Sequence, residues 1–337
     1  MSEAEVTRSG LKGVVPGRQA TTGARGKHTG RDGAPTVPRA EFASYYGKPI
    51  LNKPVWEPVD IAGYFFAGGL AGASSLLAAG AQATGRTGLA RVSKIGAVAA
   101  GAASIVGLVH DLGRPERFLH MLRVFKPTSP MSVGSWLLAA YVPLTGVAAA
   151  SAVTGRVPRL GALATGGAAA LGPAVASYTA VLVADTAVPA WHDAHRELPY
   201  VFVGSAATAA GGLGLLAAPA RQQGPARLMA LLGVAGETLM FQRMRRRMGM
   251  VGEPYSSGKS GRFIRAGEVL SVAGAAGAAL GRGRWSRPAG AALLAASACT
   301  RFGVFFAGVA SAEDPRYTVE PQRERLRGSV RQTPGNG

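Results

Sequence analysis

The sequence predicts an all-α integral membrane protein with eight transmembrane helices. Of its 337 residues, 47% are hydrophobic and only 16% are charged. The charges are unevenly spread, because four windows contain no Asp, Glu, Lys or Arg: residues 61–85, 127–155, 160–184 and 198–220. As a helix of about 20 residues, each window is long enough to cross a bilayer core of about 30 Å. All are rich in Gly, Ala and Ser, which let membrane helices pack closely, so we expect a compact bundle.

Four further windows complete the count of eight. Residues 89–110 are apolar apart from Arg91 and Lys94 near their start. The remaining windows, 226–242, 266–281 and 289–311, are shorter or less apolar, and the last carries Arg301 near its middle. Together the eight windows predict a membrane domain over residues 61–312.

The flanking segments differ from this domain in composition. Residues 1–40 are rich in Gly, Arg, Thr and Pro, which predicts a disordered basic tail. We expect no signal peptide there, because the apolar run of about 7–15 residues that one needs is missing. Residues 41–60 combine aromatics with prolines, as in a segment at the membrane interface. Residues 313–337 form a charged C-terminal tail that we expect to be extended or disordered.

The net charge of +19 invites a nucleic-acid interpretation, but the basic residues lie in loops and tails between the apolar windows. Charge of this kind sets membrane topology and contacts lipid headgroups. We therefore expect membrane lipids as partners and no nucleic acid. The single cysteine, Cys299, cannot hold an iron–sulfur cluster alone, and we expect it to be buried.

Haem and metal ions are not expected in this chain either. A haem inside the membrane would need facing histidines within the spans, whereas the four candidates lie at span ends or in loops: His110, His120, His192 and His195. The short spacing of His192 and His195 resembles that of metal ligands, but no cysteine cluster or carboxylate pair completes it. We expect His120 and His195 to be interfacial.

Threading the chain through eight spans places a set of polar residues on one side, called side A, together with both termini. The second span ends there at His110, and the fourth ends at Asp185, seven residues after Tyr178 and on the same helix face. The residues that gather on side A are Trp56, Glu57, Asp60, Tyr64, His110, Asp111, Tyr178 and Asp185. Such a cluster favours a ligand site, although His110 and Asp111 could instead cap a helix and hold the next loop.

Two ionisable residues, Glu237 and Arg301, lie inside later spans and in the same half of the membrane. Ionisable groups inside a membrane are expensive and mark a pathway or a ligand site. The alternative is a mutual buried pair without chemistry.

A lipid-soluble redox ligand suits the side-A cluster. A quinone head group needs hydrogen-bond partners at its two oxygens and a route for two protons. His110, with an unperturbed pKa of about 6.5, is the natural proton acceptor. The adjacent carboxylate of Asp111 can orient the imidazole or take the second proton. We assign the catalytic role to His110 and Asp111.

Three stretches resemble one known family. Residues 110–138, "HDLGRPERFLHMLRVFKPTSPMSVGSWLL", resemble the signature of the NrfD, or polysulfide reductase membrane-subunit, family. Residues 45–81 resemble its first-span region, and residues 178–206 resemble its turn between spans 4 and 5. The resemblance implies two four-helix bundles, a quinone or quinol at one face and no haem or iron–sulfur cluster in the chain itself. Menaquinone and ubiquinone remain equal possibilities.

Carried onto this sequence, the resemblance assigns a quinone-binding set that comprises Trp56, Tyr64, His110, Asp111, Tyr178 and Asp185. It also implies an iron–sulfur partner, linked in many relatives to a molybdenum- or tungsten-containing subunit with a molybdopterin cofactor. The residues expected to dock the partner are Arg114, Glu116, Arg117, Arg123 and Lys126, although the first three could instead form a structural ion-pair network. The "RELP" stretch, residues 196–199, would help to form that docking face.

The membrane orientation rests on opposing signals. The basic loop between spans 6 and 7 favours a cytoplasmic side A, and the short cationic loops on the other side favour the reverse. In relatives the partner is commonly extracytoplasmic, so we expect side A and both termini outside the plasma membrane of a prokaryote.

The leading hypothesis is a quinone-reactive membrane subunit of a multi-subunit oxidoreductase, formate dehydrogenase-like or polysulfide reductase-like. A second hypothesis is an ion- or proton-conducting transporter, which conduction by the isolated subunit in liposomes would support. A third is a purely structural anchor, which would show no quinone binding.

Overall fold

The computed structural model describes residues 5–7, 10–12, 50–111, 116, 120–280 and 283–332, without the side chains of residues 5–7, 10–12, 284 and 325–332. The chain divides into two compact units, Met1–Ala43 and Ser44–Gly337. In the first, β1 (Glu5–Thr7) pairs antiparallel with β2 (Gly10–Lys12), with Val6 opposite Leu11. The rest of the predicted disordered tail lies outside the described residues, so disorder there stays a prediction.

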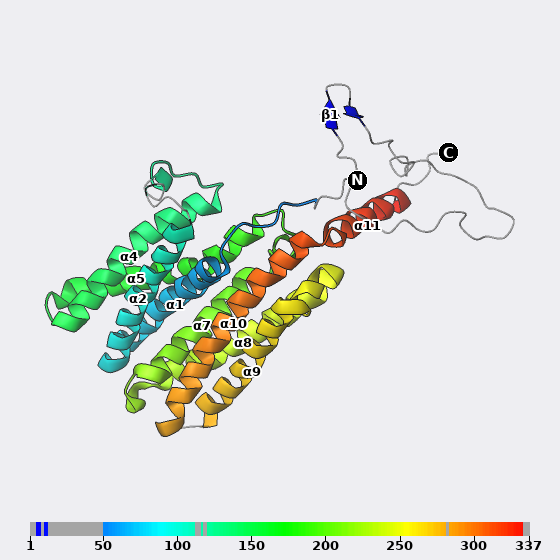
Figure 1. Ribbon diagram of the computed structural model, residues 1–337. Coiled ribbons are helices and arrows are strands. Elements are labelled where there is room, and N and C mark those ends of the chain that lie inside the picture. Colours follow the sequence, from blue (N-terminus) through cyan, green and yellow to red (C-terminus); the bar gives the residue numbers. More distant parts are fainter. Residues whose placement is uncertain are drawn as a thin grey trace. The chain divides into compact units, whose positions relative to one another are not determined.

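The described part of the second unit is helical and holds every predicted membrane window (Figure 1). Its α-helices are α1 (Pro58–Ala83), α2 (Thr87–Asp111), α4 (Pro130–Thr154), α5 (Pro158–Ala184), α6 (Pro189–His192), α7 (Leu198–Ala217), α8 (Gly224–Met248), α9 (Gly258–Leu280), α10 (Ser286–Glu313) and α11 (Arg316–Gln332). Three 3₁₀ turns join them: η2 (Ala220–Gln222), η3 (Gly249–Tyr255) and η4 (Gly283–Trp285).

Prolines lie at the starts of several of these helices, and a glycine ends α4. Pro58, Pro130 and Pro158 lie in the first turns of α1, α4 and α5, where the missing N–H has no intrahelical partner to lose. Gly155 ends α4 with φ of 68°, a left-handed conformation that an L side chain rarely adopts.

The C-terminal tail corrects one expectation. Residues Arg316–Gln332 form helix α11 rather than an extended or disordered tail. The Asp314 carboxylate accepts a hydrogen bond from the backbone N–H of Arg316 at 3.0 Å, which satisfies a free donor at the helix start. The expectation of disorder was wrong because a charged segment can also form an exposed helix.

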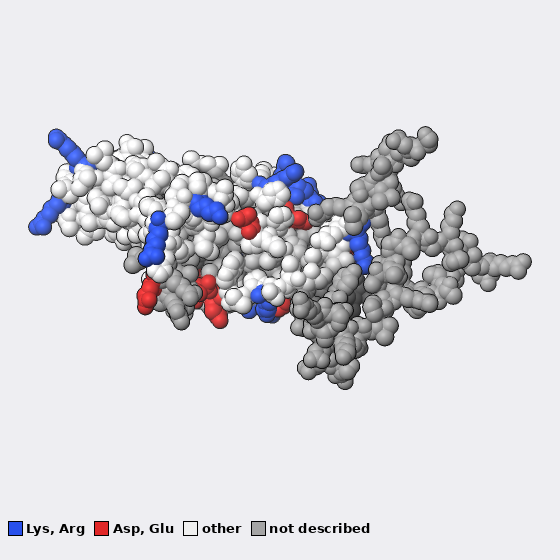
Figure 2. Space-filling view, turned by 90° about the horizontal axis from the view of Figure 1, so that it is seen from above, with Lys and Arg blue, Asp and Glu red and all other residues white. Residues whose placement is uncertain are grey.

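Seven of the described helices are long and apolar enough to span a membrane: α1, α2, α4, α5, α7, α9 and α10. Helix α8 has a similar length, 25 residues, but Arg227, Glu237 and a group of arginines near its end lower its hydropathy. Figure 2 shows a stretch of uncharged surface between Lys or Arg side chains at one tip and mixed charges further along. The described part of the second unit is therefore an all-helical body with seven candidate membrane spans.

The long helices pack as two sets of neighbours. In the first group, α1 packs against α2 and α5, and α4 packs against α5 and α2. In the second group, α7 packs against α8 and α10, and α9 packs against α10 and α8. Helix α1 also contacts α7 and α10, which joins the two groups (Figure 1).

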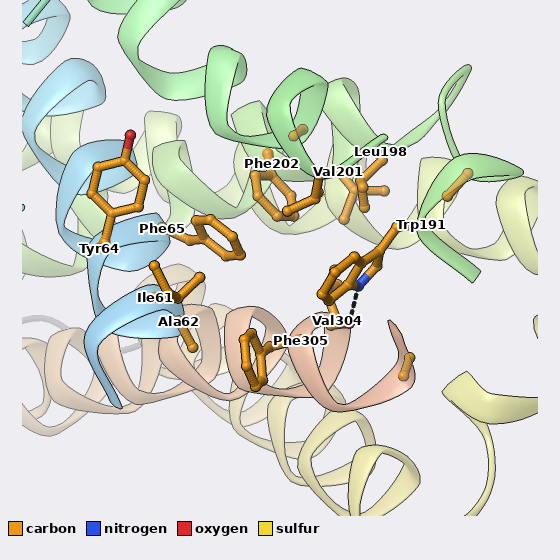
Figure 3. Packing of buried hydrophobic residues seen from close by; sticks show 14 of the residues in the cluster. Ile61, Ala62, Tyr64, Phe65, Trp191, Leu198, Val201, Phe202, Val304 and Phe305 are labelled. Atoms are coloured by element: carbon orange, nitrogen blue, oxygen red, sulfur yellow. Dashed lines mark hydrogen bonds between the residues drawn. The ribbon is translucent and has the colours of Figure 1, made fainter. Parts of the chain in front are cut away.

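A buried aromatic core occupies this junction (Figure 3). Trp191 of α6, which is fully buried, packs on Phe305 of α10, and Phe65 of α1 packs on Phe202 of α7. The indole N–H of Trp191 donates to the carbonyl oxygen of Val304 at 2.8 Å, so the only polar atom of this side chain is satisfied. The core fixes the segment between α5 and α7, which carries His192, His195 and Glu197.

Candidate functional site

The polar residues expected on side A do meet at one end of the helical body. The imidazole of His110, at the end of α2, lies 2.6 Å from the Asp60 carboxylate in the first turn of α1, measured between Nδ1 and Oδ2. The His110 side chain is 76% exposed, whereas that of Asp60 is only 19% exposed. The pair therefore links a shielded carboxylate to a solvent-accessible imidazole.

Asp111 makes a different contact from its neighbour. Its Oδ1 accepts a hydrogen bond of 3.2 Å from the backbone N–H of Glu57, the N-cap residue of α1. This bond links the end of α2 to the start of α1. It fits the alternative that Asp111 has a structural role at a helix end and does not bind a ligand.

Tyr64 of α1 and Tyr178 of α5 are both buried, and their hydroxyls are hydrogen-bonded to each other. The rings meet edge to face, with centroids 6.2 Å apart and an interplanar angle of 77°. The sequence places both residues on side A, and the structure brings them into direct contact.

Two grooves lie on the two sides of this tyrosine pair. The Tyr64 groove has a volume of about 540 Å³ and is lined by Asp60, Gly63, Tyr64, Val106, Gly107 and Leu213, among others. The Tyr178 groove has a volume of about 590 Å³ and is lined by Val133, Leu137, Ser177, Tyr178, Asp185 and His192, among others. His110 and Asp111 line neither groove.

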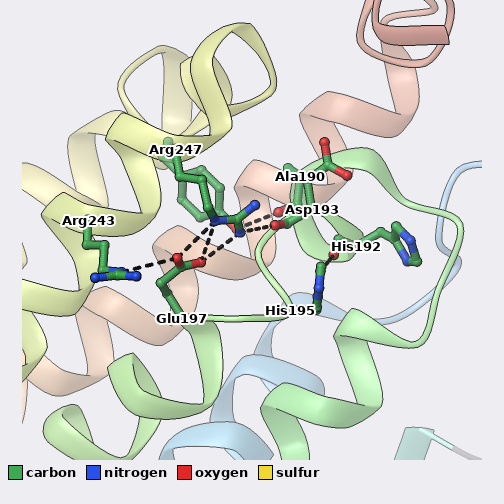
Figure 4. Close-up of polar contacts among 8 residues, drawn as sticks. Ala190, His192, Asp193, His195, Glu197, Arg243 and Arg247 are labelled. Carbon is green, nitrogen blue, oxygen red and sulfur yellow. Dashed lines mark hydrogen bonds and ion pairs between the residues drawn. The ribbon is translucent and has the colours of Figure 1, made fainter. Parts of the chain in front are cut away.

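The Tyr178 groove adds two residues to those that the sequence singles out. His192 and His195 both line it, close to Asp185, the C-cap residue of α5. His192 Nδ1 donates to the Ala184 carbonyl at 3.1 Å. His195 Nδ1 donates to the His192 carbonyl at 3.0 Å (Figure 4). In the neutral form both imidazoles therefore present Nε2 as an acceptor. Their position just after a span end was the available signal, but the sequence does not show that the chain turns back onto α5.

Trp56 lines neither groove. Its ring stacks on that of Trp191, with centroids 5.6 Å apart and an interplanar angle of 20°. Trp56 is half-buried in this position, so the structure gives it a packing contact with the aromatic core.

Glu237 and Arg301 are both buried, but the Glu237 carboxylate and the Arg301 guanidinium are more than 4.0 Å apart and form no ion pair. Glu237 accepts hydrogen bonds from Thr300 at 2.7 Å and from Thr208 at 3.5 Å. Arg301 donates to the Phe202 carbonyl at 2.7 Å, and its guanidinium lies 3.7 Å from the centroid of the Phe202 ring. Each group is thus bound to neutral partners.

A buried ion pair lies near the start of α7 (Figure 4). Glu197 is 3% exposed, and its carboxylate accepts three hydrogen bonds of 2.7–3.0 Å from Arg247 of α8. Arg247 also donates to the carbonyl of Asp193, and Arg243 lies 3.7 Å from Glu197. These bonds hold the pKa of Glu197 below its ordinary value. Its buried carboxylate is engaged by Arg247 and does not suit a docking role, whereas Arg196 of the same stretch is exposed.

The predicted docking residues are partly described. Glu116, Arg123 and Lys126 are exposed, and the last two lie in the segment that leads into α4. Arg114 and Arg117 lie outside the described residues. Across the described chain, no group of three or more His, Cys, Asp or Glu side chains has the geometry of a metal site.

These features define a multi-pass membrane protein with a polar cluster at one end. The family described as "Polysulphide reductase, NrfD" matches residues 50–234, which are 185 of the 337 residues. The chain therefore belongs to the NrfD family, as the resemblance of its motifs predicts, and membership implies a membrane subunit of a molybdopterin oxidoreductase complex. No curated protein matches the chain.

Proposed function

We propose that this chain is the quinone-reactive membrane subunit of its complex and exchanges electrons between quinone and an iron–sulfur partner. In this proposal α8 is the eighth membrane span, and the two groups of neighbouring helices are two four-helix bundles. The membrane is the plasma membrane of a prokaryote, with side A and both termini extracytoplasmic. A molybdenum- or tungsten-containing subunit completes the complex.

The Tyr178 groove is the observation that carries the proposal. Its volume of about 590 Å³ falls within the range of roughly 300–1,000 Å³ that small-molecule sites occupy. Val133, Leu137 and Val181 supply apolar walls, while Tyr178 and the two histidines supply polar groups. A few polar groups on an apolar wall are what a ring with two oxygens requires, so the residues fit a quinone head group.

The chemistry follows from the atoms that the groove presents. A bound quinone supplies a carrier of two electrons and two protons. Tyr178 can donate a hydrogen bond through its hydroxyl, which is oriented by Tyr64, and the Nε2 atoms of His192 and His195 can accept one. The hydroxyl donor suits a quinone oxygen, and the Nε2 acceptors suit a quinol hydroxyl, so the site can hold both forms.

Proton exchange with water is assigned to the pair of His110 and Asp60. The Tyr178 hydroxyl in the quinone groove is hydrogen-bonded to that of Tyr64, which lines the other groove together with Asp60. His110 joins the Asp60 carboxylate to solvent. Histidine is suited to this step, because its unperturbed pKa of about 6.5 lets it gain and lose a proton near neutral pH. Asp111 acts as a positioning residue, since its hydrogen bond to Glu57 fixes the ends of α1 and α2.

The substitution Tyr178→Phe tests the proposed site in the assembled complex. It removes the hydroxyl and keeps the ring, so we expect KM for a soluble quinone analogue to rise about 3- to 10-fold, as for one lost hydrogen bond. Tyr141→Phe is the matched control, because Tyr141 is also buried and hydrogen-bonded, to Ser75 at 2.6 Å, but lines neither groove.

Equal kinetics in the two variants would contradict the assignment of the quinone to this groove. A complex that assembles normally but shows no electron exchange with any quinone analogue would favour the purely structural anchor. Conduction by the isolated subunit without a quinone would favour the transporter.

A further inference from the structure

A second feature of side A lies outside the quinone proposal, at the end of α8 and the start of α9. Basic residues crowd this region: Arg243, Arg245, Arg246, Arg247, Lys259, Arg262 and Arg265. Ion pairs occupy some of them, since Arg243 and Arg247 face Glu197 and Arg245 lies 3.7 Å from Glu268. Among the described residues, no carboxylate lies within 4.0 Å of the cations of Arg246, Arg262 or Arg265. The region therefore has an excess of positive charge.

A pocket of about 350 Å³ opens within this cluster. Its lining includes Gln242, Arg245, Arg246, Gly252, Glu253 and Ser256. Arg245 is held in place by a hydrogen bond of 2.8 Å to the Ser256 hydroxyl. The one carboxylate in the lining, that of Glu253, is already paired with Arg316 at 3.0 Å. Two guanidinium groups thus face a concave space whose acid is neutralised, which suits a phosphate group.

A second groove, of about 270 Å³, runs between α8, α9 and α10. Phe241, Ile264 and Val272 give it apolar walls, and Gln242 lines both this groove and the arginine pocket. Two carboxylates also line it: Glu237 is engaged by Thr300 and Thr208, and Glu268 lies 3.7 Å from Arg245. The two spaces are therefore neighbours, one cationic and one largely apolar.

The surface beside this groove is apolar. Leu239 on α8 and Val269 on α9 expose more than half of their area. On α8 the positions after Leu239 on the same face are Gln242 and Arg246, and on α9 the positions before Val269 are Arg262 and Arg265. Both apolar stripes therefore end in arginines at the same level, as expected where a membrane helix reaches the headgroup region.

We propose that this composite site binds an anionic phospholipid, with its phosphate between Arg245 and Arg246 and one acyl chain along the groove between α8 and α9. Charge complementarity selects the headgroup, because basic pockets between membrane helices attract anionic lipids. The adjoining apolar groove favours a lipid over an acidic protein segment, because only the lipid carries an acyl chain that can lie along the groove.

Native mass spectrometry of the full chain in detergent tests the proposal, with phosphatidylglycerol and phosphatidylcholine titrated separately. We expect the unaltered protein to prefer phosphatidylglycerol. The double substitution R245Q/R246Q is expected to lower that affinity about tenfold, since each cation near the surface contributes to anionic-lipid binding, and to leave phosphatidylcholine unaffected. R245K/R246K, which keeps the charge, is expected to retain most of the affinity.

The matched control is R156Q/R159Q, which removes the same charge from two exposed arginines, one in the loop after α4 and one in the first turn of α5. It is expected to change phosphatidylglycerol affinity less than twofold. An excess of inorganic phosphate, which lacks a chain, should not displace the lipid. Equal affinity for the two lipids, an unchanged affinity in R245Q/R246Q, or displacement by inorganic phosphate would each overturn the proposal. None of these outcomes bears on the quinone site, which lies in the other group of helices.

Discussion

In the first group of helices α1 crosses α5 at Gly72 and Gly172, and in the second group α7 crosses α10 at Gly212 and Gly290. In both crossings a Cβ on either glycine would overlap the carbonyl oxygen of the other. The first and last helices of each group thus approach as closely as backbones allow, which is how membrane helices gain packing energy without a hydrophobic effect. The two groups share this framework and the same order of neighbouring helices.

Their polar residues, however, lie at different depths. The first group carries Asp60 and the exposed His110 at its rim, beside grooves that reach the tyrosine pair. The second group buries Glu237 and Arg301 against neutral partners. A polar group at the rim can exchange protons with water, whereas a buried and bonded one mainly fixes helix positions. In the proposed function, the same framework therefore supports proton exchange in the first group and rigidity in the second.

The largest effect is expected from Arg301→Ala, in the second group. The substitution removes a fully buried side chain, takes the side-chain donor away from the Phe202 carbonyl and opens a cavity, so we expect a loss of about 3–5 kcal/mol in stability. Thermal unfolding in detergent measures the loss as a lower Tm. Arg159→Ala is the control, because Arg159 is exposed. Equal Tm values for the two variants would show that the buried arginine does not hold the second group together.

The opposite behaviour is expected from His110→Ala in the first group. Its side chain is mostly exposed, so Tm should stay within about 1 °C, an effect typical of surface substitutions. Quinone-coupled turnover of the complex should fall about 100-fold, the lower range for loss of a general acid or base. His120→Ala, an exposed histidine in the same loop region, is the control. Unchanged turnover in His110→Ala would remove the proposed route for protons.

The junction between the groups gives a third comparison. A Cβ at Gly308 of α10 would overlap the ring of Trp191, so Gly308→Ala is expected to cost about 1–3 kcal/mol through overpacking. Gly80→Ala on α1 is the control, because a Cβ there meets nothing within 4 Å. Thermal unfolding of both variants checks the difference, and equal stability would mean that the aromatic core adapts easily.

Sequence reasoning predicts the helices of this protein well, and the reason is local. Uncharged windows, first-turn prolines and terminal glycines act within one segment, so they are visible without the fold. Side-chain partners are harder to predict from the sequence, because they depend on how each helix is rotated about its axis. The sequence places Asp60 and His110 on one side, for example, but does not predict that they are paired.

The candidate site shows the same limit. Tyr178 and Asp185 share a helix face and do line one groove, as their spacing indicates. His192 joins them only because residues 186–197 turn back across α5, held by Trp191 in the aromatic core. A turn of this kind is set by long-range packing. In the same way, Glu237 and Arg301 have opposite charges and lie in one half of the membrane, but they bond to neighbours that helix packing supplies.

The smallest effect concerns the pair that fixes α7 to α8. Because Arg247 lowers the pKa of Glu197, the pair stabilises the folded state above the unfolded pKa of about 4.3 and loses this contribution as the pH falls below it. Glu197→Gln should therefore cost about 1 kcal/mol at pH 7, and the difference from the unaltered protein should shrink below about pH 4. Tm measured against pH tests this. Glu253→Gln, at an exposed ion pair with Arg316, should change Tm less at every pH. A difference that grows on acidification would mean that Glu197 is protonated more readily in the folded protein, and the second group would then share the pH sensitivity assigned here to the rim of the first.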